Sequence, residues 1–418
     1  MRMEMAVLSN KYLLILIIGI GLSACSDQTT GTIRLVAEGG CIHRFFDTSP
    51  ISPSGKYIAL FRFLDETHSP RPGSLGEVFV QDVESGEVVF SVPSCGWEMQ
   101  LGANVQWGKS DEELFYNDVD TTTWQAYAVR LNFKTGEKMR CAGTVFMVSP
   151  DGNELLSYNL CKSHFAQVGY GVIVPDSVVR RNVGPVADDG VYVTDLKTNS
   201  CRMIASLADI YEKSVPSIAI PNPHDYEYYC FQVKWNLQGT RVLTTVQWTP
   251  LSGGERRRAV ITMNPDGSDI RTAITPEQWE RGGHHINWMP DGDHLSMNLN
   301  IDGKEGVEIV SVKYDGTDLK EVYPIGSGHP SFNVAGLPYI VTDAYAGEVT
   351  AGKGLTPIRL INYEQQTEYN LAEVYLPPIR DFEFRVDAHP AWDRTGRYVV
   401  FNGMKDEHRC VYMVEMKY

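Results

Sequence analysis

The stretch Ile286-Asn-Trp288-Met-Pro-Asp-Gly292-Asp-His-Leu-Ser296 decides the fold, because its pattern returns along the whole chain. An aromatic or apolar residue is followed by a turn of the Pro/Asp/Gly type, and then by an apolar strand. Glycine in the turn allows a positive φ and alternating apolar residues follow it, which is typical of a β-hairpin. Seven copies occur, beginning at Ile51, Val105, Val148, Val233, Ile286, Pro330 and Pro390.

A second hairpin follows the first in six of the seven units, and two hairpins give the four strands of a propeller blade. The seventh unit ends with the chain, so we expect residues 32–37 to supply its missing outer strand and close the ring. The sequence therefore predicts an all-β, seven-bladed β-propeller over residues 32–418. Two stacked smaller propellers or a pair of sandwiches are the alternatives. The second turns lie at 82–86, 131–136, 195–199, 263–267, 313–316 and 362–366.

Two segments exceed the length of a blade, and the composition limits the partners. Residues near 160–190 and 206–229 are interpreted as insertions over one face of the ring. The 418 residues carry a formal net charge of -15, which disfavours nucleic acid as a partner. The eight cysteines include no Cys-x-x-Cys pair, so a zinc knuckle is not expected.

The first 24 residues predict a signal peptide of the lipoprotein type. The apolar run from Tyr12 to Gly21 spans about 15 Å as a helix, too short for a membrane core of about 30 Å. Leu22-Ser-Ala-Cys25 resembles the bacterial lipobox, which implies cleavage before Cys25, lipid attachment to its thiol and a polar tether over 25–31. We expect a bacterial cell-envelope protein, on the periplasmic or surface face, that reaches the membrane only through this anchor. An ordinary signal peptide with a coincidental cysteine is the alternative.

Three histidines, His285, His329 and His389, stand directly before the repeat in the last three units. Equivalent positions of successive blades lie at the same depth and radius, so the three imidazoles are expected at one mouth of the central channel. Gln232 holds this position in the fourth unit, and His43 lies somewhat earlier in the first. Imidazole with carboxylate or amide oxygen suits Mn²⁺, Zn²⁺, Ca²⁺ or Fe²⁺. The alternative is that a His-Pro turn is simply common in these blades.

At these residues the chain resembles the oligogalacturonate lyase family, seven-bladed propellers with a metal at the channel mouth, and its repeats resemble Tol-type and WD-like propeller repeats. The resemblance covers most of the chain after residue 40 and is most specific after residue 230. The segment from His285 to Gly292 matches the family's Thr-His-Glu-Phe-Trp-x-Pro-Asp-Gly motif, which implies that His285 is the catalytic base. The family's later Ser-His motif matches His329, and its His-Pro run matches His389. This implies that both histidines are metal ligands.

The chain departs from the family pattern at two positions. Asp387 replaces the first histidine of the family's His-Pro-His-Pro run and becomes the third candidate metal ligand, while Phe384 stands where the family has glutamine. The resemblance implies Mn²⁺ first, with Ca²⁺ or Zn²⁺ also compatible. Arg258, within Arg256-Arg257-Arg258, matches an arginine that assists catalysis in the family, with a one-residue ambiguity.

The implied chemistry is metal-assisted β-elimination on an acidic, uronate-containing poly- or oligosaccharide. A base removes the proton next to the carboxylate, while the metal and Arg258 neutralise the developing charge. Tyr170 is the candidate for protonating the leaving group, and Gln232, His43 and His284 are candidate substrate contacts. Some ulvan lyases are also seven-bladed propellers, so another uronate polymer is an alternative substrate. The alternative function is a non-catalytic Tol-type propeller lipoprotein that binds glycan or protein partners, and glycoside hydrolysis by paired carboxylates is also open.

Overall fold

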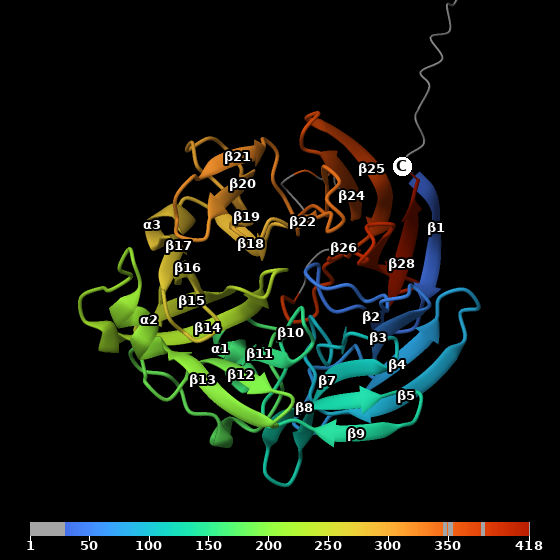
Figure 1. Cartoon of the computed structure of the whole chain (residues 1–418), viewed down its shortest axis with the longest axis horizontal. Helices are drawn as coiled ribbons and strands as arrows, with labels where there is room; N and C mark the ends of the chain where they lie inside the picture. Colours follow the sequence, from blue (N-terminus) through green and yellow to red (C-terminus); the bar gives the residue numbers. More distant parts are fainter. Residues whose placement is uncertain (1–29, 346–348, 350–353, 378–380, 418) are drawn as a thin grey trace, which may run out of the picture.

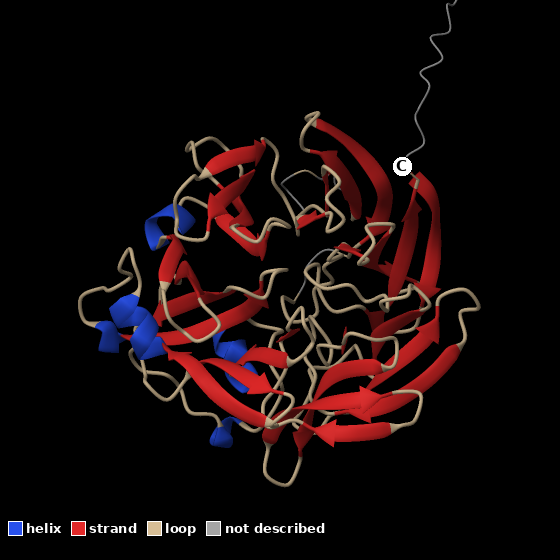
Figure 2. Ribbon diagram, in the orientation of Figure 1, coloured by secondary structure: helices blue, strands red, loops and turns tan. Residues whose placement is uncertain are grey.

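Seven antiparallel sheets of four strands each surround a central axis in the computed structural model, which describes residues 30–345, 349, 354–377 and 381–417 (Figure 1). Strands make up most of the regular structure, and the few helices lie in connections between strands (Figure 2). The predicted all-β, seven-bladed β-propeller is confirmed. The expected signal peptide, Cys25 and most of the expected tether lie outside the described residues.

The first six blades follow one another along the chain, and each has its strands in sequence order from the inside of the ring to the outside (Figure 1). The first blade contains β2 (Cys41–Ile42), β3 (Tyr57–Phe63), β4 (Gly76–Asp82) and β5 (Val88–Ser94). The second contains β6 (Gln106–Trp107), β7 (Glu113–Asp120), β8 (Gln125–Asn132) and β9 (Glu137–Arg140). The third contains β10 (Met147–Val148), β11 (Glu154–Tyr158), β12 (Gly190–Asp195) and β13 (Ser200–Ser206).

The next three blades carry most of the predicted site residues. The fourth contains β14 (Tyr226–Trp235), β15 (Val242–Pro250), β16 (Arg257–Met263) and β17 (Arg271–Ile274). After α3 (Pro276–Trp279), the fifth contains β18 (Gly283–Trp288), β19 (His294–Leu299), β20 (Glu308–Lys313) and β21 (Lys320–Tyr323). The sixth contains β22 (Ser331–Phe332), β23 (Tyr339–Thr342), β24 (Leu355–Asn362) and β25 (Thr367–Tyr375).

Strands from both ends of the chain close the ring in the seventh blade. β26 (Ala391–Trp392), β27 (Tyr398–Lys405) and β28 (His408–Met416) are joined on the outside by β1 (Thr30–Ala37). In this pair Ile33 lies opposite Val414 and Leu35 lies opposite Tyr412. The predicted closure by the N-terminal strand is confirmed, and it removes the free strand edges that an open ring would expose.

The aromatic residue of the repeat ties a blade to the one before it. In three blades the indole N–H of this residue donates to a carbonyl oxygen of the preceding blade. The pairs are Trp107 with Pro50 (2.7 Å), Trp288 with Lys234 (3.1 Å) and Trp392 with Ser331 (2.9 Å). The turn that follows needs glycine, because Gly292 has a φ of 77°. The repeat therefore combines a turn former with a bond between blades.

Both predicted insertions emerge from the third blade. The first, between β11 and β12, contains η1 (Leu160–Lys162), α1 (Ser163–Ala166) and η2 (Asp176–Val178). The second follows β13 and contains α2 (Leu207–Lys213) and η3 (Pro223–Asp225). It ends earlier than the predicted residue 229, because β14 begins at Tyr226 and pairs with β15 from there. α1 packs against β14, which places the first insertion beside the fourth blade.

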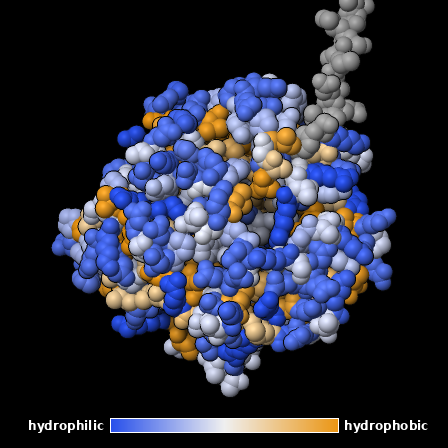
Figure 3. Space-filling model, viewed as in Figure 1, coloured by the Kyte–Doolittle hydropathy of each residue, from blue (hydrophilic) through white to orange (hydrophobic). Residues whose placement is uncertain are grey.

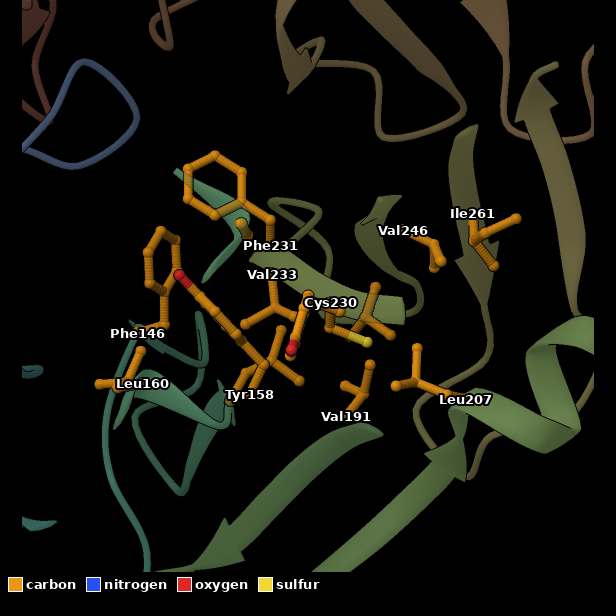
Figure 4. Packing of buried hydrophobic residues seen from close by; sticks show 14 of the residues in the cluster. Phe146, Tyr158, Leu160, Val191, Leu207, Cys230, Phe231, Val233, Val246 and Ile261 are labelled. Carbon is orange, nitrogen blue, oxygen red and sulfur yellow. The ribbon is translucent and has the colours of Figure 1, made fainter. Parts of the chain in front are cut away.

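Apolar side chains fill the spaces between adjacent blades. A large cluster joins the third and fourth blades and includes Phe146, Tyr158, Val191, Val233 and Ile261 (Figure 4). Full burial of one such aliphatic or aromatic side chain contributes about 1.5–3 kcal/mol. The face shown in Figure 3 is mostly hydrophilic, with scattered hydrophobic patches. Among the described residues, no helix has both the length and the apolar character needed to cross a membrane.

Candidate metal centre and active site

Three residues at the position predicted to face the channel share an unusual backbone conformation, two of them within the innermost strands β14 and β18 and the third just before β26. Gln232, His285 and His389 have φ values of 57°, 59° and 48°. This left-handed region is uncommon for residues other than glycine and clusters at functional sites. The ladder registers of β14 and β18 shift at the same place, and such a bulge redirects a side chain.

The three histidines predicted to share one mouth of the channel are in contact. The ring centroids of His285 and His329 lie 3.8 Å apart, and those of His329 and His389 lie 4.3 Å apart with the rings nearly perpendicular. His329 and His389 are buried, while His285 is half-buried. The ring therefore gathers three imidazoles that are more than forty residues apart in sequence.

His329, Asp387 and His389 form a group that can hold a metal ion. One nitrogen or oxygen atom of each lies within 4.8 Å of the other two. His389 Nε2 lies 3.8 Å from Asp387 Oδ2, beyond hydrogen-bond distance, and neither ring nitrogen of His389 has a hydrogen-bond partner among the described residues. Unpartnered buried nitrogens cost free energy that coordination of a metal offsets. Three protein ligands leave coordination positions open for a substrate.

Asp343 orients one of these ligands, although no motif of the sequence singles it out. Its Oδ1 accepts the main-chain N–H of His329 at 2.7 Å, and its two oxygens lie 2.9 and 3.0 Å from His329 Nδ1. An ionised carboxylate only accepts, so Nδ1 carries the proton and Nε2 keeps its lone pair for a metal. Burial acts to raise the pKa of Asp343, but the charge and hydrogen bonds of His329 outweigh it and lower that pKa. The feature that could have identified Asp343 is its position directly after the buried strand β23.

His285 presents one ring nitrogen as an acceptor. Its Nδ1 lies 2.7 Å from Gly328 O, and since a carbonyl only accepts, Nδ1 carries the proton and Nε2 the lone pair. Tyr345 Oη lies 3.3 Å from His285 Nε2 and 3.4 Å from His329 Nε2, so this tyrosine, which the sequence reasoning missed, joins the cluster. Burial, with the charges of His329 and His284, lowers the pKa of His285 well below its ordinary value. The imidazole is therefore neutral near pH 7.

Two buried phenylalanines from the first blade, Phe45 and Phe46, pack against the three histidines and are called the Phe plug. The Phe45 ring lies 4.6 Å from that of His389, and the Phe46 ring lies 5.4 Å from His329 and 5.9 Å from His285. Their segment follows β2 toward the middle of the ring (Figure 1). Phe46 also lines a cavity of about 380 Å³ among the tryptophans of the repeats. Phe46 therefore contacts two of the histidines and also borders that cavity.

A buried ion network fixes the segment that carries the Phe plug. Lys234 Nζ lies 3.1 Å from Asp47 Oδ2 and donates to Ile286 O at 2.8 Å. Arg44 pairs with the other oxygen of Asp47. Burial lowers the pKa of Lys234 to about 8, although the charge of Asp47 opposes the shift. Because Ile286 directly follows His285, the network also holds the strand that carries the candidate base.

Tyr170, the predicted proton donor, lies at the edge of the cluster. Arg385 Nε donates to Asp387 Oδ2 at 3.0 Å, and its guanidinium carbon lies 5.3 Å from the centre of the Tyr170 ring. Burial raises the pKa of Tyr170 above its ordinary value. The structure thus brings a residue of the first insertion beside Asp387. It also adds Arg385, which no motif had indicated, as a cation next to a candidate metal ligand.

Arg258 and His284, two further predicted residues, border the cluster. Arg258 makes no direct contact with the three histidines in the described part of the chain. Its guanidinium carbon lies 5.8 Å from the centre of the Trp279 ring, in a cavity that Gly283 also lines. His284 Nδ1 lies 2.8 Å from His285 Nδ1, so His284 touches the candidate base.

Gln232 and His43, the other predicted substrate contacts, are buried. They are 5% and 1% exposed, close to the values for His329 and His389, which are 0% and 1% exposed. Burial lowers the pKa of His43 to about 4. The role of these two residues as substrate contacts stays a prediction.

Fold and site together define a seven-bladed propeller with a histidine–carboxylate cluster at its central channel. No protein-family model and no curated protein matches the sequence. Among solved structures, the chain is similar to an oligogalacturonate lyase in complex with manganese, with a TM-score of 0.60, 14% identity and coverage of 92% of this chain and 93% of that one. An oligogalacturonate lyase from Vibrio parahaemolyticus gives a TM-score of 0.57, 14% identity and coverage of 93% and 94%.

A putative TolB from Agrobacterium tumefaciens is more distant, with a TM-score of 0.39, 12% identity and coverage of 79% of this chain and 94% of that one. The two oligogalacturonate lyases confirm, at the level of the fold, the resemblance expected from the sequence. Activity has to be argued from the site.

Proposed function

We propose that this protein is a metal-assisted lyase that cleaves a uronate-containing poly- or oligosaccharide by β-elimination. The observation that carries the proposal is the meeting of a candidate metal centre, His329, Asp387 and His389, with the neutral imidazole of His285. The likeness in fold to two oligogalacturonate lyases supports it.

A divalent cation fits the residues present. Two neutral imidazoles and one carboxylate suit Mn²⁺ and also admit Ca²⁺ or Zn²⁺. Mn²⁺ is preferred because one similar lyase is in complex with manganese. His329 Nε2, the His389 imidazole and an Asp387 oxygen would hold the ion. When bound, it supplies positive charge where the substrate carboxylate gains electron density.

His285 Nε2 is the proposed base. It takes the proton from the carbon next to the carboxylate, and the electron pair of that C–H bond forms the new carbon–carbon double bond. The bond to the 4-linked sugar oxygen breaks, and that oxygen receives a proton from Tyr345 or Tyr170. Burial keeps this imidazole neutral near pH 7, so the lone pair of Nε2 is available to take the proton.

The decisive assay follows the absorbance of unsaturated uronate ends on trigalacturonate and on ulvan, with Mn²⁺ and after chelation. We expect His285→Ala to lose at least about a hundredfold in rate while it still binds Mn²⁺, whereas His389→Ala loses Mn²⁺ binding as measured by calorimetry. The matched control is His294→Ala, because His294 begins β19 outside the cluster and its Nδ1 lies 2.8 Å from Asp291 Oδ2. Uronide binding by the wild-type protein without any unsaturated product would identify a glycan-binding propeller instead.

We also propose that the chain is anchored to the bacterial envelope through Cys25. The proposal rests on Leu22-Ser-Ala-Cys25 and the short apolar run before it. Radiolabelled palmitate should be incorporated into the wild-type protein and not into Cys25→Ser. Equal labelling of both proteins would contradict the anchor.

A further inference from the structure

The cavity that Phe46 borders lies on the axis of the ring and is called the axial cavity. Each of the seven blades contributes lining residues, most of them from the innermost strands or from the repeat turns that follow these strands. Its volume of about 380 Å³ falls in the usual range of small-molecule sites, about 300–1,000 Å³. The residues of the candidate metal centre do not line it, so a ligand in the axial cavity would occupy a separate site.

The walls of the axial cavity are largely apolar and aromatic. Phe46 and Phe332 line it together with four tryptophans of the repeat. Leu237 and Val334, in the repeat turns of the fourth and sixth blades, also line it and are 47% and 39% exposed. Exposed aliphatic side chains beside an aromatic cavity indicate a surface for an apolar group. The four tryptophans are Trp107, Trp235, Trp288 and Trp392.

Trp235 departs from the bonding pattern of the other three tryptophans. Each of those donates its indole N–H to a carbonyl oxygen of the preceding blade. Trp235 Nε1 is buried and has no hydrogen-bond partner among the described residues. A buried donor without a partner costs free energy, which an acceptor atom of a ligand would offset.

Two cations stand at the rim of the axial cavity. Lys109 and Arg394 line it, and both residues are exposed. Arg394 Nη2 donates to Gly108 O at 2.9 Å and to Trp107 O at 3.2 Å, so a side chain of the seventh blade reaches the second blade next to Lys109. In the part of the chain that the structure describes, no carboxylate forms an ion pair with either cation.

The two carboxylates that line the axial cavity already have partners. Asp47 pairs with Arg44 and with Lys234. Asp393 is buried, and its Oδ1 accepts the main-chain N–H of Tyr398 at 2.7 Å. The uncompensated charge of the cavity is therefore positive, although the net charge of the chain is -15. A local positive charge of this kind attracts an anion.

We propose that the axial cavity binds a small amphipathic carboxylate, with its apolar part among the tryptophans and its charged end at Lys109 and Arg394. Guanidinium and ammonium groups form charge-assisted hydrogen bonds with a carboxylate, and aromatic walls bury apolar surface. The two cations favour an acid over a neutral compound of the same shape. This site goes beyond the proposed lyase function and does not depend on it, because it shares no lining residue with the candidate metal centre.

Calorimetric titration with 1-naphthoate and with the neutral 1-naphthalenemethanol tests the proposal on the intact protein. A chelator is present throughout, so that the carboxylate cannot bind a metal ion at the histidines. We expect saturable binding of one 1-naphthoate per protein molecule. The alcohol should bind at least about threefold more weakly, the effect of losing an exposed ion pair.

Arg394→Gln should weaken 1-naphthoate binding by a similar factor and leave the affinity for the alcohol unchanged. Arg397→Gln is the matched control, because Arg397 stands three residues later, pairs with Glu415 and does not line the axial cavity.

A second pair of substitutions tests the rim at exposed positions, where the fold tolerates change. Leu237→Glu places a negative charge beside the proposed carboxylate and should weaken 1-naphthoate binding at least about tenfold. Leu251→Glu is its control, because Leu251 is 51% exposed on the fourth blade and does not line the axial cavity.

Three results would overturn the proposal on chemical grounds: no saturable binding of 1-naphthoate, equal affinities for the acid and the alcohol, or equal affinities of the Arg394→Gln and Arg397→Gln proteins for the acid. Equal effects of Leu237→Glu and Leu251→Glu would overturn it on location, since the acid would then bind outside the axial cavity.

Discussion

His329 and Asp343 hold each other in one orientation at the centre of the ring. The aspartate accepts from both the main-chain N–H and the ring Nδ1 of the histidine, at 2.7 and 2.9 Å, and both side chains are buried. A carboxylate behind a histidine fixes the tautomer and the ring direction and raises the basicity of the opposite nitrogen. The pair therefore aims His329 Nε2 at the space shared with His389 and Asp387.

Asp343→Asn should weaken Mn²⁺ binding about tenfold to a hundredfold. The neutral amide fixes the tautomer of His329 less firmly, and the substitution removes the negative charge behind that imidazole. Calorimetric titration with Mn²⁺ measures the effect. Asp291→Asn is the matched control, since Asp291 also contacts a histidine Nδ1, that of His294, but on an exposed turn. Unchanged affinity in Asp343→Asn would remove Asp343 from the metal centre.

Tyr345→Phe should lower kcat more than Tyr170→Phe does. The Tyr345 hydroxyl lies within 3.3 Å of His285 Nε2, whereas Tyr170 reaches the cluster through Arg385 and Asp387. Loss of an acid–base group costs about a hundredfold or more in rate, and a smaller change in KM is expected because the ring remains. Steady-state rates of unsaturated-product formation compare the two variants. A larger loss in Tyr170→Phe would return the proton-donor role to the residue that the sequence suggested.

Glu98 should make the protein less stable as the pH rises. Burial raises the pKa of Glu98 to about 8 from an ordinary 4.5, although the N–H of Gly171 and the charges of Arg44 and Arg385 favour the ionised form. Between these two pKa values the folded chain binds one more proton than the unfolded chain, so the free energy of unfolding falls by about 1.4 kcal/mol per pH unit from this group. The contribution is complete below pH 4.5 and is lost as the pH rises through 8.

Glu98→Gln removes that dependence, because the amide stays neutral in both states and can still accept from Gly171. Urea unfolding at pH 5 and pH 7.5 tests it. The variant should gain stability relative to the wild-type protein between the two values. A constant difference would show that Glu98 is ionised in the folded chain.

Phe45→Ala should destabilise the fold by about 3–5 kcal/mol, the usual cost of emptying a buried aromatic site. It should also weaken Mn²⁺ binding, because the Phe45 ring supports His389 at 4.6 Å. Tyr369→Ala, at a side chain that is 49% exposed on β25, is the control and should change stability by less than about 0.5 kcal/mol. Equal effects of the two substitutions would contradict a supporting role for the Phe plug.

Much of the fold could be predicted because its unit is short and repeated. Gly292 and its counterparts mark the turns, Trp288 and its counterparts mark the inner strands, and seven copies leave one outer strand to be found at the N-terminus. The end of the second insertion was misplaced by a few residues, since Tyr226–Tyr229 look like a loop until they are seen to pair with β15. Local pattern does not reveal such long-range pairing.

Site residues could be predicted from the sequence only where they recur at equivalent positions of successive repeats. His285, His329 and His389 share a phase, so the ring symmetry alone brings them near one another. Gln232 and His43 were assigned by the same reasoning and are also buried, and neither belongs to the group that can hold a metal. Asp343, Tyr345 and Arg385 carry no motif at all, and only folding brings the loop after β23 and the connection after β25 to the histidines.

The sequence by itself determined the number of blades, the closure of the ring and which histidines point to one channel, because these follow from periodicity and covalent order. Only the tertiary structure decided which side chains contact those histidines. The Phe plug that packs against them and the carboxylate behind His329 both come from segments that are not adjacent to the histidines in sequence. Their free energies depend on burial and on distances of a few ångströms, which only the folded chain sets.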